Sequence, residues 1–248
     1  MVSEDMDRND SDFNKRYSNH KDNSNHKENT GRIENRILII TGGKIDEEFL
    51  KYRVINGKYS MIIAADHGLL AADRLGLSLD YIVGDFDSVP EGLLKKYRDM
   101  STPVKTFPTE KDKTDTQIAL ELALMHNPSL IDIIGATGNR QDHVLANIHL
   151  MILPLQLNVE AYILDTYTKI YLKQKSFTIG KDSQAGDYVS LLPFTPEVRG
   201  LTLRGFKYPL DAITMTVGNS LGISNVIVEE TAEIEFVSGI LVVIETKD

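Results

Sequence analysis

Short apolar runs separated by helical patterns constrain the fold of this 248-residue chain more than any other feature. A run without polar alternation is typical of a strand that is buried on both faces, as in a parallel sheet. Four such runs occupy residues 37–40, 61–65, 81–84 and 130–134. Helical patterns lie between them at residues 69–75, 90–97 and 115–125, the last with Ile118, Leu122 and Met125 on one stripe. Strands alternating with helices predict βαβ units and a mostly parallel sheet.

The pattern changes near residue 158, after which strands follow one another without a convincing helix. They are predicted at residues 159–164, 169–172, 188–192, 201–203, 234–237 and 240–244. We therefore expect an α/β fold, with a Rossmann-like, mostly parallel sheet and helices at residues 36–157 and an all-β sandwich at residues 158–248. Residues 1–35 are predicted to be a disordered tail, because this polar segment offers little apolar surface to bury.

Charge and composition exclude several classes of protein. The formal net charge of −9 argues against nucleic acid as a main partner, since phosphate backbones attract clustered Lys and Arg. The absence of cysteine excludes disulfides and thiolate metal sites, and it fits a reducing compartment. No apolar run approaches the roughly 18–20 residues of a membrane span, and the charged N-terminus is unlike a secretory signal. We expect a cytoplasmic protein that binds neither nucleic acid nor membrane.

Polar residues follow the predicted strands, at the point where each strand ends. Ligands of open parallel sheets bind beyond the carboxyl ends of the strands, so these turns should meet at one edge. Asp66 follows the second strand, residues 84–88 follow the third, and a loop at residues 135–143 follows the fourth. A further charged cluster at residues 110–115 opens a helix. Three acidic clusters and one glycine-rich loop are therefore expected to share a site.

Asp85 and Asp87 stand at positions i and i+2, which places both side chains on one side of an extended backbone. Two carboxylates at about 5 Å repel by roughly 3 kcal/mol at an effective dielectric of 20, and a cation between them reverses that cost. Oxygen ligands suit Mg²⁺, which usually takes one or two carboxylates together with substrate phosphates. Alternatively, Asp87 or Ser88 caps the helix that starts at Pro90.

Two helix starts have the same double interpretation. Thr114 or Asp115 either caps the helix at 115–125 or, with Lys111 and Lys113 beside it, receives an anionic phosphate. Arg140 offers a fixed fork of donors in a turn whose two glycines let backbone amides approach a phosphate. Asp142 caps the next helix, orients Arg140 or contacts substrate. Neither the P-loop pattern nor the dinucleotide-binding glycine pattern occurs in the chain.

Taken together, these segments resemble the thiamine pyrophosphokinase family, from about residue 36 to the end of the chain. The N-terminal matches are Ala65-Asp66, Gly84-Asp85-Phe86-Asp87-Ser88, Lys111-Asp112-Lys113-Thr114-Asp115, and residues 135–143 with Leu145-Ala146-Asn147. The C-terminal matches are Ser190-Leu191-Leu192-Pro193, Gly200-Leu201-Thr202-Leu203 and Gly222-Ile223-Ser224-Asn225. Where many members have Asp-Gly-Gly, this chain has Asp66-His67-Gly68.

The resemblance implies an N-terminal catalytic domain that binds ATP, a C-terminal β-sandwich that binds thiamine, and a homodimer with active sites shared between subunits. It implies that Asp85, Asp87 and Asp115 hold Mg²⁺ and, with Arg140, form the catalytic set. Further substrate contacts are implied for Asp66, Asp112, Thr114, Asp142, Ser224 and Asn225.

The expected reaction converts ATP and thiamine to AMP and thiamine diphosphate, with Asp115 or Asp142 as a base if one is needed. One alternative is a related diphosphokinase that acts on a hydroxymethyl pterin. Another is a non-catalytic sensor of nucleotide or thiamine, which has no need to keep carboxylates that repel one another without a metal.

Overall fold

The computed structural model describes residues 35–86, 89–106 and 112–248. The predicted tail, except for Asn35, lies outside these residues, and so do Asp87, Ser88 and Lys111. The described chain forms two compact units that divide between Asp165 and Thr166. No helix in the described part is long and apolar enough to cross a membrane.

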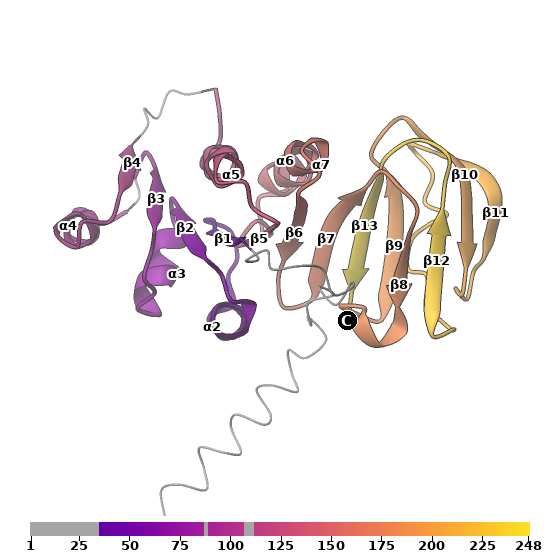
Figure 1. Ribbon diagram of the computed structural model, residues 1–248, viewed down its shortest axis with the longest axis horizontal. Coiled ribbons are helices and arrows are strands. Elements are labelled where there is room, and N and C mark those ends of the chain that lie inside the picture. Colours follow the sequence, from indigo (N-terminus) through magenta and orange to yellow (C-terminus); the bar gives the residue numbers. More distant parts are fainter. Residues whose placement is uncertain (1–34, 87–88, 107–111) are drawn as a thin grey trace, which may run out of the picture. The chain divides into compact units, whose positions relative to one another are not determined.

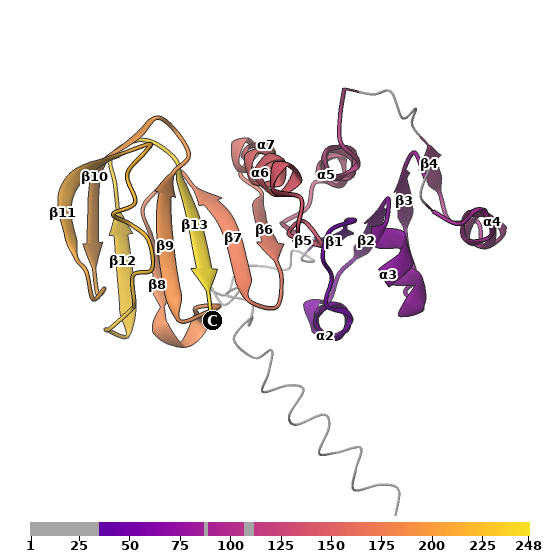
Figure 2. The same ribbon diagram turned by 180° about the vertical axis from the view of Figure 1, so that it is seen from behind.

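The first unit contains a six-stranded parallel sheet in the order β4-β3-β2-β1-β5-β6. Helices connect the strands, with α2 and α3 on one face of the sheet and α5, α6 and α7 on the other (Figures 1 and 2). In chain order the elements are β1 (Arg36–Ile40), α2 (Glu47–Gly57), β2 (Met61–Ala65), α3 (Gly68–Arg74), β3 (Tyr81–Gly84), α4 (Glu91–Asp99), β4 (Val104–Thr106), α5 (Asp115–Met125), β5 (Leu130–Ile134), α6 (Gln141–Leu150), α7 (Ile152–Gln156) and β6 (Glu160–Leu164).

The parallel pairing of β1, β2, β3 and β5 confirms the predicted parallel sheet, and every residue of β1 and β5 is buried as expected. Helix α5 has the predicted bounds, and its predicted stripe is correct only in part. Leu122 is buried, together with Ala119, Leu120 and Ala123, whereas Met125 is 76% exposed. The buried residues face β1, β2 and β3, which the helix contacts.

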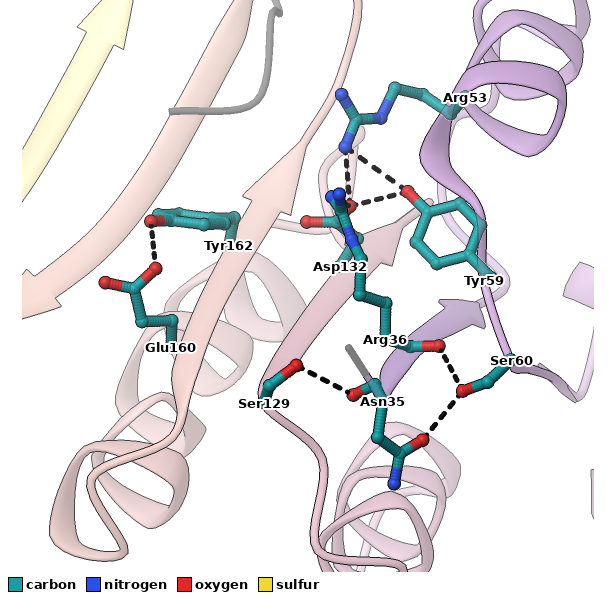
Figure 3. A network of polar contacts seen from close by, with 9 residues as sticks. All are labelled: Asn35, Arg36, Arg53, Tyr59, Ser60, Ser129, Asp132, Glu160 and Tyr162. Carbon is teal, nitrogen blue, oxygen red and sulfur yellow. Dashed lines mark hydrogen bonds and ion pairs between the residues drawn. The ribbon is translucent and has the colours of Figure 1, made fainter. Parts of the chain in front are cut away.

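A buried polar network pins α2 to the sheet (Figure 3). Asp132 in β5 is fully buried and accepts hydrogen bonds from Arg53 of α2 at 2.6 Å and from the hydroxyl of Tyr59 at 2.5 Å. Burial, followed by the charge of Asp132, raises the pKa of Tyr59 well above its ordinary value of 10.0. At the edge of the network, Ser60 donates to Asn35 at 2.7 Å. Buried charges paired in this way hold elements in one arrangement, since breaking a pair leaves an uncompensated charge.

The boundary between the units differs from the expected one at residues 157 and 158. The predicted strand at 159–164 was assigned to the all-β part, yet β6 pairs in parallel with β5 along its whole length. Strand β6 therefore belongs to the first unit. Its run Glu160–Leu164 buries Ala161, Ile163 and Leu164, a pattern that does not distinguish parallel from antiparallel pairing.

The second unit consists of two antiparallel sheets, with the orders β7-β13-β9 and β11-β10-β12-β8. Strand β12 has one buried face and one solvated face. It buries Ala232 and Ile234 and exposes the residues that alternate with them. Only a short 3₁₀ turn, Lys181–Ser183, interrupts the described strands. The strands are β7 (Thr168–Lys173), β8 (Phe177–Gly180), β9 (Tyr188–Pro193), β10 (Glu197–Arg204), β11 (Leu210–Thr216), β12 (Thr231–Glu235) and β13 (Leu241–Thr246).

Candidate active site

The order of the parallel strands places a topological switch point between β1 and β5. The connection after β1 leads to β2 on one side, and the connection after β5 leads to β6 on the other. Ligands of open α/β sheets bind in the crevice where such connections part. A pocket of about 820 Å³ lies there, and its lining includes the turns that follow β1, β2, β3 and β5.

Backbone hydrogen bonds join the turns after β1 and β5 and form one wall of the pocket. The amide of Gly43 donates to the carbonyl of Gly135 at 2.7 Å, and the amide of Lys44 donates to that of Thr137 at 2.8 Å. A Cβ at Gly43 would lie 2.2 Å from the Thr137 carbonyl oxygen, so only glycine fits. The turn at 41–43 was not predicted as part of the site, although it follows a buried strand as the other site turns do.

The N-terminus of α5 forms a second part of the lining. Thr114 caps the helix, because its hydroxyl oxygen accepts a hydrogen bond from the amide of Gln117 at 3.2 Å. Thr114, Asp115 and Thr116 all line the pocket. The Thr116 hydroxyl also contacts that of Thr41 at 2.8 Å, which ties the helix start to the end of β1. Capping and ligand contact are therefore compatible here, since the cap uses only the acceptor side of the Thr114 hydroxyl.

Three carboxylates line the pocket: Asp66 after β2, Asp85 after β3 and Asp115 at the start of α5. The expected geometry of Asp85 and Asp87 is wrong in one respect. Phe86 between them has φ +63°, so the backbone is not extended there and the i, i+2 argument does not apply. Asp87 itself lies outside the described residues. Within the described part of the chain, no three acidic or histidine side chains converge closely enough to hold a metal ion.

Arg140 lies at the mouth of the pocket with its guanidinium on Asp142. Its Nη2 donates to Oδ2 of Asp142 at 2.6 Å and its Nε to Oδ1 at 3.3 Å. This hydrogen bond from Arg140 lowers the pKa of Asp142, and the same contact raises the pKa of Arg140. The residue before helix α6, Arg140, makes no side-chain cap, and Asp142 in the first turn of the helix orients the guanidinium of Arg140. A hydrogen bond from the backbone of His143 also lowers the pKa of Asp142, so this carboxylate interacts with the helix start as well.

Arg140 lines the pocket, and the glycine-rich loop before it is held by two side chains from other elements. Asn147 of α6 donates to the carbonyl of Ala136 at 2.9 Å, and Thr137 donates to Asp165 at 2.8 Å. Asn147 is 6% exposed, although it also lines the pocket. The loop is therefore fixed from behind, with its backbone open to a ligand in front.

The structure does not bring every predicted site residue to this pocket. Asp112 is exposed and does not contribute to the lining, and Ser224 and Asn225 belong to the second unit. The side chain of Asn225 donates to the carbonyl of Tyr208 at 2.8 Å and accepts from its amide at 3.0 Å. The Ser224 backbone has φ +54°, and its amide donates to Ser190 at 2.9 Å. In the second unit, Asn225 thus holds a loop in place and Ser224 lies on its exposed side.

Comparison with protein families gives two matches along the chain. Residues 52–163 match the family described as "Thiamin pyrophosphokinase, catalytic domain". Residues 176–241 match the family described as "Thiamin pyrophosphokinase, vitamin B1 binding domain". The pocket-lining residues Asp66, Asp85, Asp115 and Arg140 fall within the first match.

Individual relatives agree with these matches. A thiamine pyrophosphokinase of Bacillus subtilis is 33% identical over 192 residues, which is 77% of this chain and 89% of the relative. A crystal structure of thiamine pyrophosphokinase from Bacillus subtilis has a TM-score of 0.76 at 32% identity, covering 86% of this chain and 99% of the other. A structure from Geobacillus thermodenitrificans has a TM-score of 0.74 at 30% identity, with 86% and 98% covered.

Proposed function

Because the chain belongs to the thiamin pyrophosphokinase family, we propose that it transfers the terminal diphosphate of ATP to thiamine and releases AMP. The observation that carries the residue-level account is the pocket at the switch point between β1 and β5. Three carboxylates, the α5 N-terminus and Arg140 line that pocket together. This combination suits a polyphosphate that arrives with a cation.

In the reaction, the hydroxyl oxygen of thiamine attacks the β-phosphorus of ATP. A new oxygen–phosphorus bond forms, and the bond between the β-phosphorus and the oxygen that bridges to the α-phosphorus breaks. AMP leaves with that oxygen, and the hydroxyl proton passes to Asp115, Asp142 or solvent. Such transfers depend mostly on positioning and charge neutralisation, for which Arg140 and the hydroxyl of Thr114 supply donors.

Magnesium fits the donor chemistry of the pocket. Asp85 and Asp115 line it together, and carboxylate oxygens are the ligands that Mg²⁺ takes alongside substrate phosphates. We propose that these two residues hold the ion with Asp87. When bound, the ion would neutralise part of the phosphate charge.

For the protein as a whole, we propose a cytoplasmic homodimer in which a Rossmann-like unit and a β-sandwich complete shared active sites. Ser224 and Asn225 would form part of the thiamine pocket and Asp142 would lie near thiamine, while Asp66 and Asp112 would contact substrate. Mixing Asp85→Asn subunits with Ser224→Ala/Asn225→Ala subunits tests the sharing. Shared sites predict partial recovery of activity, because both lesions can fall in one site of a heterodimer. Confirmed heterodimers without recovery would contradict shared sites.

The function itself is tested by AMP release from ATP with thiamine, with a hydroxymethyl pterin or with no acceptor. We expect AMP only with thiamine. Release with the pterin alcohol would identify the related diphosphokinase. Thiamine and nucleotide binding without AMP would identify a sensor.

A further inference from the structure

His67 is a departure from the Asp-Gly-Gly sequence of many family members, and the structure places it in the pocket. The two positions after Asp66 differ in what they tolerate. A Cβ at Gly68 would lie 2.1 Å from the carbonyl oxygen of Ile40, so this glycine is required for α3 to pack on β1. Position 67 has room for a side chain, and the imidazole is 43% exposed there.

The imidazole contacts Asp66 and lies against the turn after β1. Its Nδ1 is 2.8 Å from Oδ2 of Asp66. A Cβ at Gly42 would lie 3.0 Å from the Cβ of His67 and 3.7 Å from Oδ2 of Asp66. Gly42 therefore leaves the space in which the imidazole and the carboxylate meet. The contact with the imidazole supports Asp66, whose backbone has φ +47°, a left-handed conformation that L side chains rarely adopt.

From this geometry we propose that His67 is a positioning residue for ATP binding, an inference that rests on the proposed function. By donating from Nδ1 to Oδ2, the imidazole fixes the rotamer of Asp66. The other oxygen, Oδ1, then accepts a hydrogen bond from the bound nucleotide or from a water that its metal carries. Any form of the ring that carries a proton on Nδ1 can donate this hydrogen bond.

The test compares His67→Ala and His67→Gly with His67→Asn in the full chain, with ATP varied at saturating thiamine. Asn can still donate to Asp66, whereas Ala and Gly cannot. We expect Ala and Gly to raise the KM for ATP about five- to tenfold, the scale of one ordinary hydrogen bond. The kcat should change by less than about twofold, and Asn should restore the KM. Asp66→Asn should raise the KM at least as much, and adding His67→Ala to it should have no further effect.

Lys96→Ala is a matched control outside the pocket. Lys96 donates to Asp73 at 2.6 Å, and that carboxylate is 27% exposed, as against 28% for Asp66. Its loss should leave the KM for ATP unchanged. A normal KM in His67→Ala, no rescue by Asn, or full additivity with Asp66→Asn would each overturn the role of His67.

A direct binding measurement separates this inference from the proposed function. A non-hydrolysable ATP analogue with Mg²⁺ is titrated into the wild-type protein and into His67→Ala. We expect five- to tenfold weaker binding by the variant, and equal affinities would overturn the inference. If the wild-type protein formed no AMP with thiamine, the proposed function would fail, and this titration would still decide about His67.

Discussion

Two arginine–aspartate pairs in the first unit have the same contact distance and opposite surroundings. Arg53 and Asp132 meet at 2.6 Å with their side chains 5% and 0% exposed. Arg140 and Asp142 also meet at 2.6 Å, but their side chains are 72% and 64% exposed. The first pair joins a helix to the middle of a strand, and the second lies at the start of helix α6, beyond the end of a strand.

Because of this difference in exposure, we expect the buried pair to stabilise the fold and the exposed pair to bind a ligand. Removing one member of the buried pair takes the hydrogen-bonded counter-charge from a buried charge, which is costly. The exposed pair adds little to stability, because water solvates either charge when the contact breaks. For the same reason Arg140 can exchange its carboxylate partner for a phosphate at little cost. We therefore expect the ion pair at the strand end to serve a ligand and the one inside the sheet to serve the fold.

The largest effect is expected from Asp132→Ala. Loss of this carboxylate should lower the free energy of unfolding by about 3–5 kcal/mol, because it removes the buried acceptor that Arg53 and Tyr59 share. Urea unfolding measures this, and the folded fraction should keep its kcat and KM. Asp142→Ala is the control, which should leave the unfolding midpoint unchanged. Similar midpoints for both variants would remove the distinction between the two pairs.

Asp85→Asn should have the next largest effect, on turnover. We expect a fall of about 100-fold or more, the scale of losing one electrostatic contact to a transition state. The thermal midpoint should hold, since Asp85 is only half-buried. A lower midpoint together with normal turnover would instead assign Asp85 to the structure of the turn.

Arg140→Lys tests the exposed arginine–aspartate pair beside the pocket. Lysine keeps the charge but loses the planar fork, so kcat/KM should fall by about tenfold with no change in stability. Arg74→Lys is a suitable control, because Arg74 is 57% exposed and pairs with Glu47 outside the pocket. Equal kinetic effects of the two substitutions would show that the fork of Arg140 has no special role.

Tyr59→Phe tests the buried pair and has the smallest expected effect. The free energy of unfolding should fall by about 1 kcal/mol for the loss of one hydrogen bond. The pKa of Tyr59 is raised in the folded state, so its contribution is complete below the unfolded value of 10.0 and is lost as the pH rises above it. The stability difference between the wild type and Tyr59→Phe should therefore shrink above about pH 10. A difference that stays constant between pH 7 and 11 would contradict the raised pKa.

Apolar runs were sufficient to predict β1, β2, β3 and β5 of the parallel sheet, because these strands are mostly apolar. The apolar pattern failed where a polar residue is paired inside the protein. Helix α2 was not predicted, although Asp46 caps it, and it buries Arg53 beside Phe49 and Leu50. The sequence analysis treated the run at 130–134 as apolar although it contains Asp132, and only the fold reveals the partner of that residue. Strand β6 was misassigned because a single strand does not reveal the direction of its neighbour.

The candidate site was predictable to the extent that it lies directly after strands. That rule placed Asp66, Asp85 and Arg140 at one edge, and the structure brings them to one pocket. The rule could not give the left-handed backbone at Phe86, which depends on tertiary packing. It also gave no position for Asp112, because the preceding strand β4 (Val104–Thr106) was not predicted. Gly43 was not predicted, because the candidate residues were selected for charged side chains and not for backbone amides.

The most direct test of the account follows the β-phosphorus of ATP through a single turnover. ATP labelled at that position is mixed with the protein, Mg²⁺ and thiamine, and the labelled products are separated. Transfer of the intact diphosphate predicts label in thiamine diphosphate, one AMP for each molecule formed, and a much slower appearance of both in Asp85→Asn. Label in ADP, or in inorganic diphosphate released equally without thiamine, would contradict it.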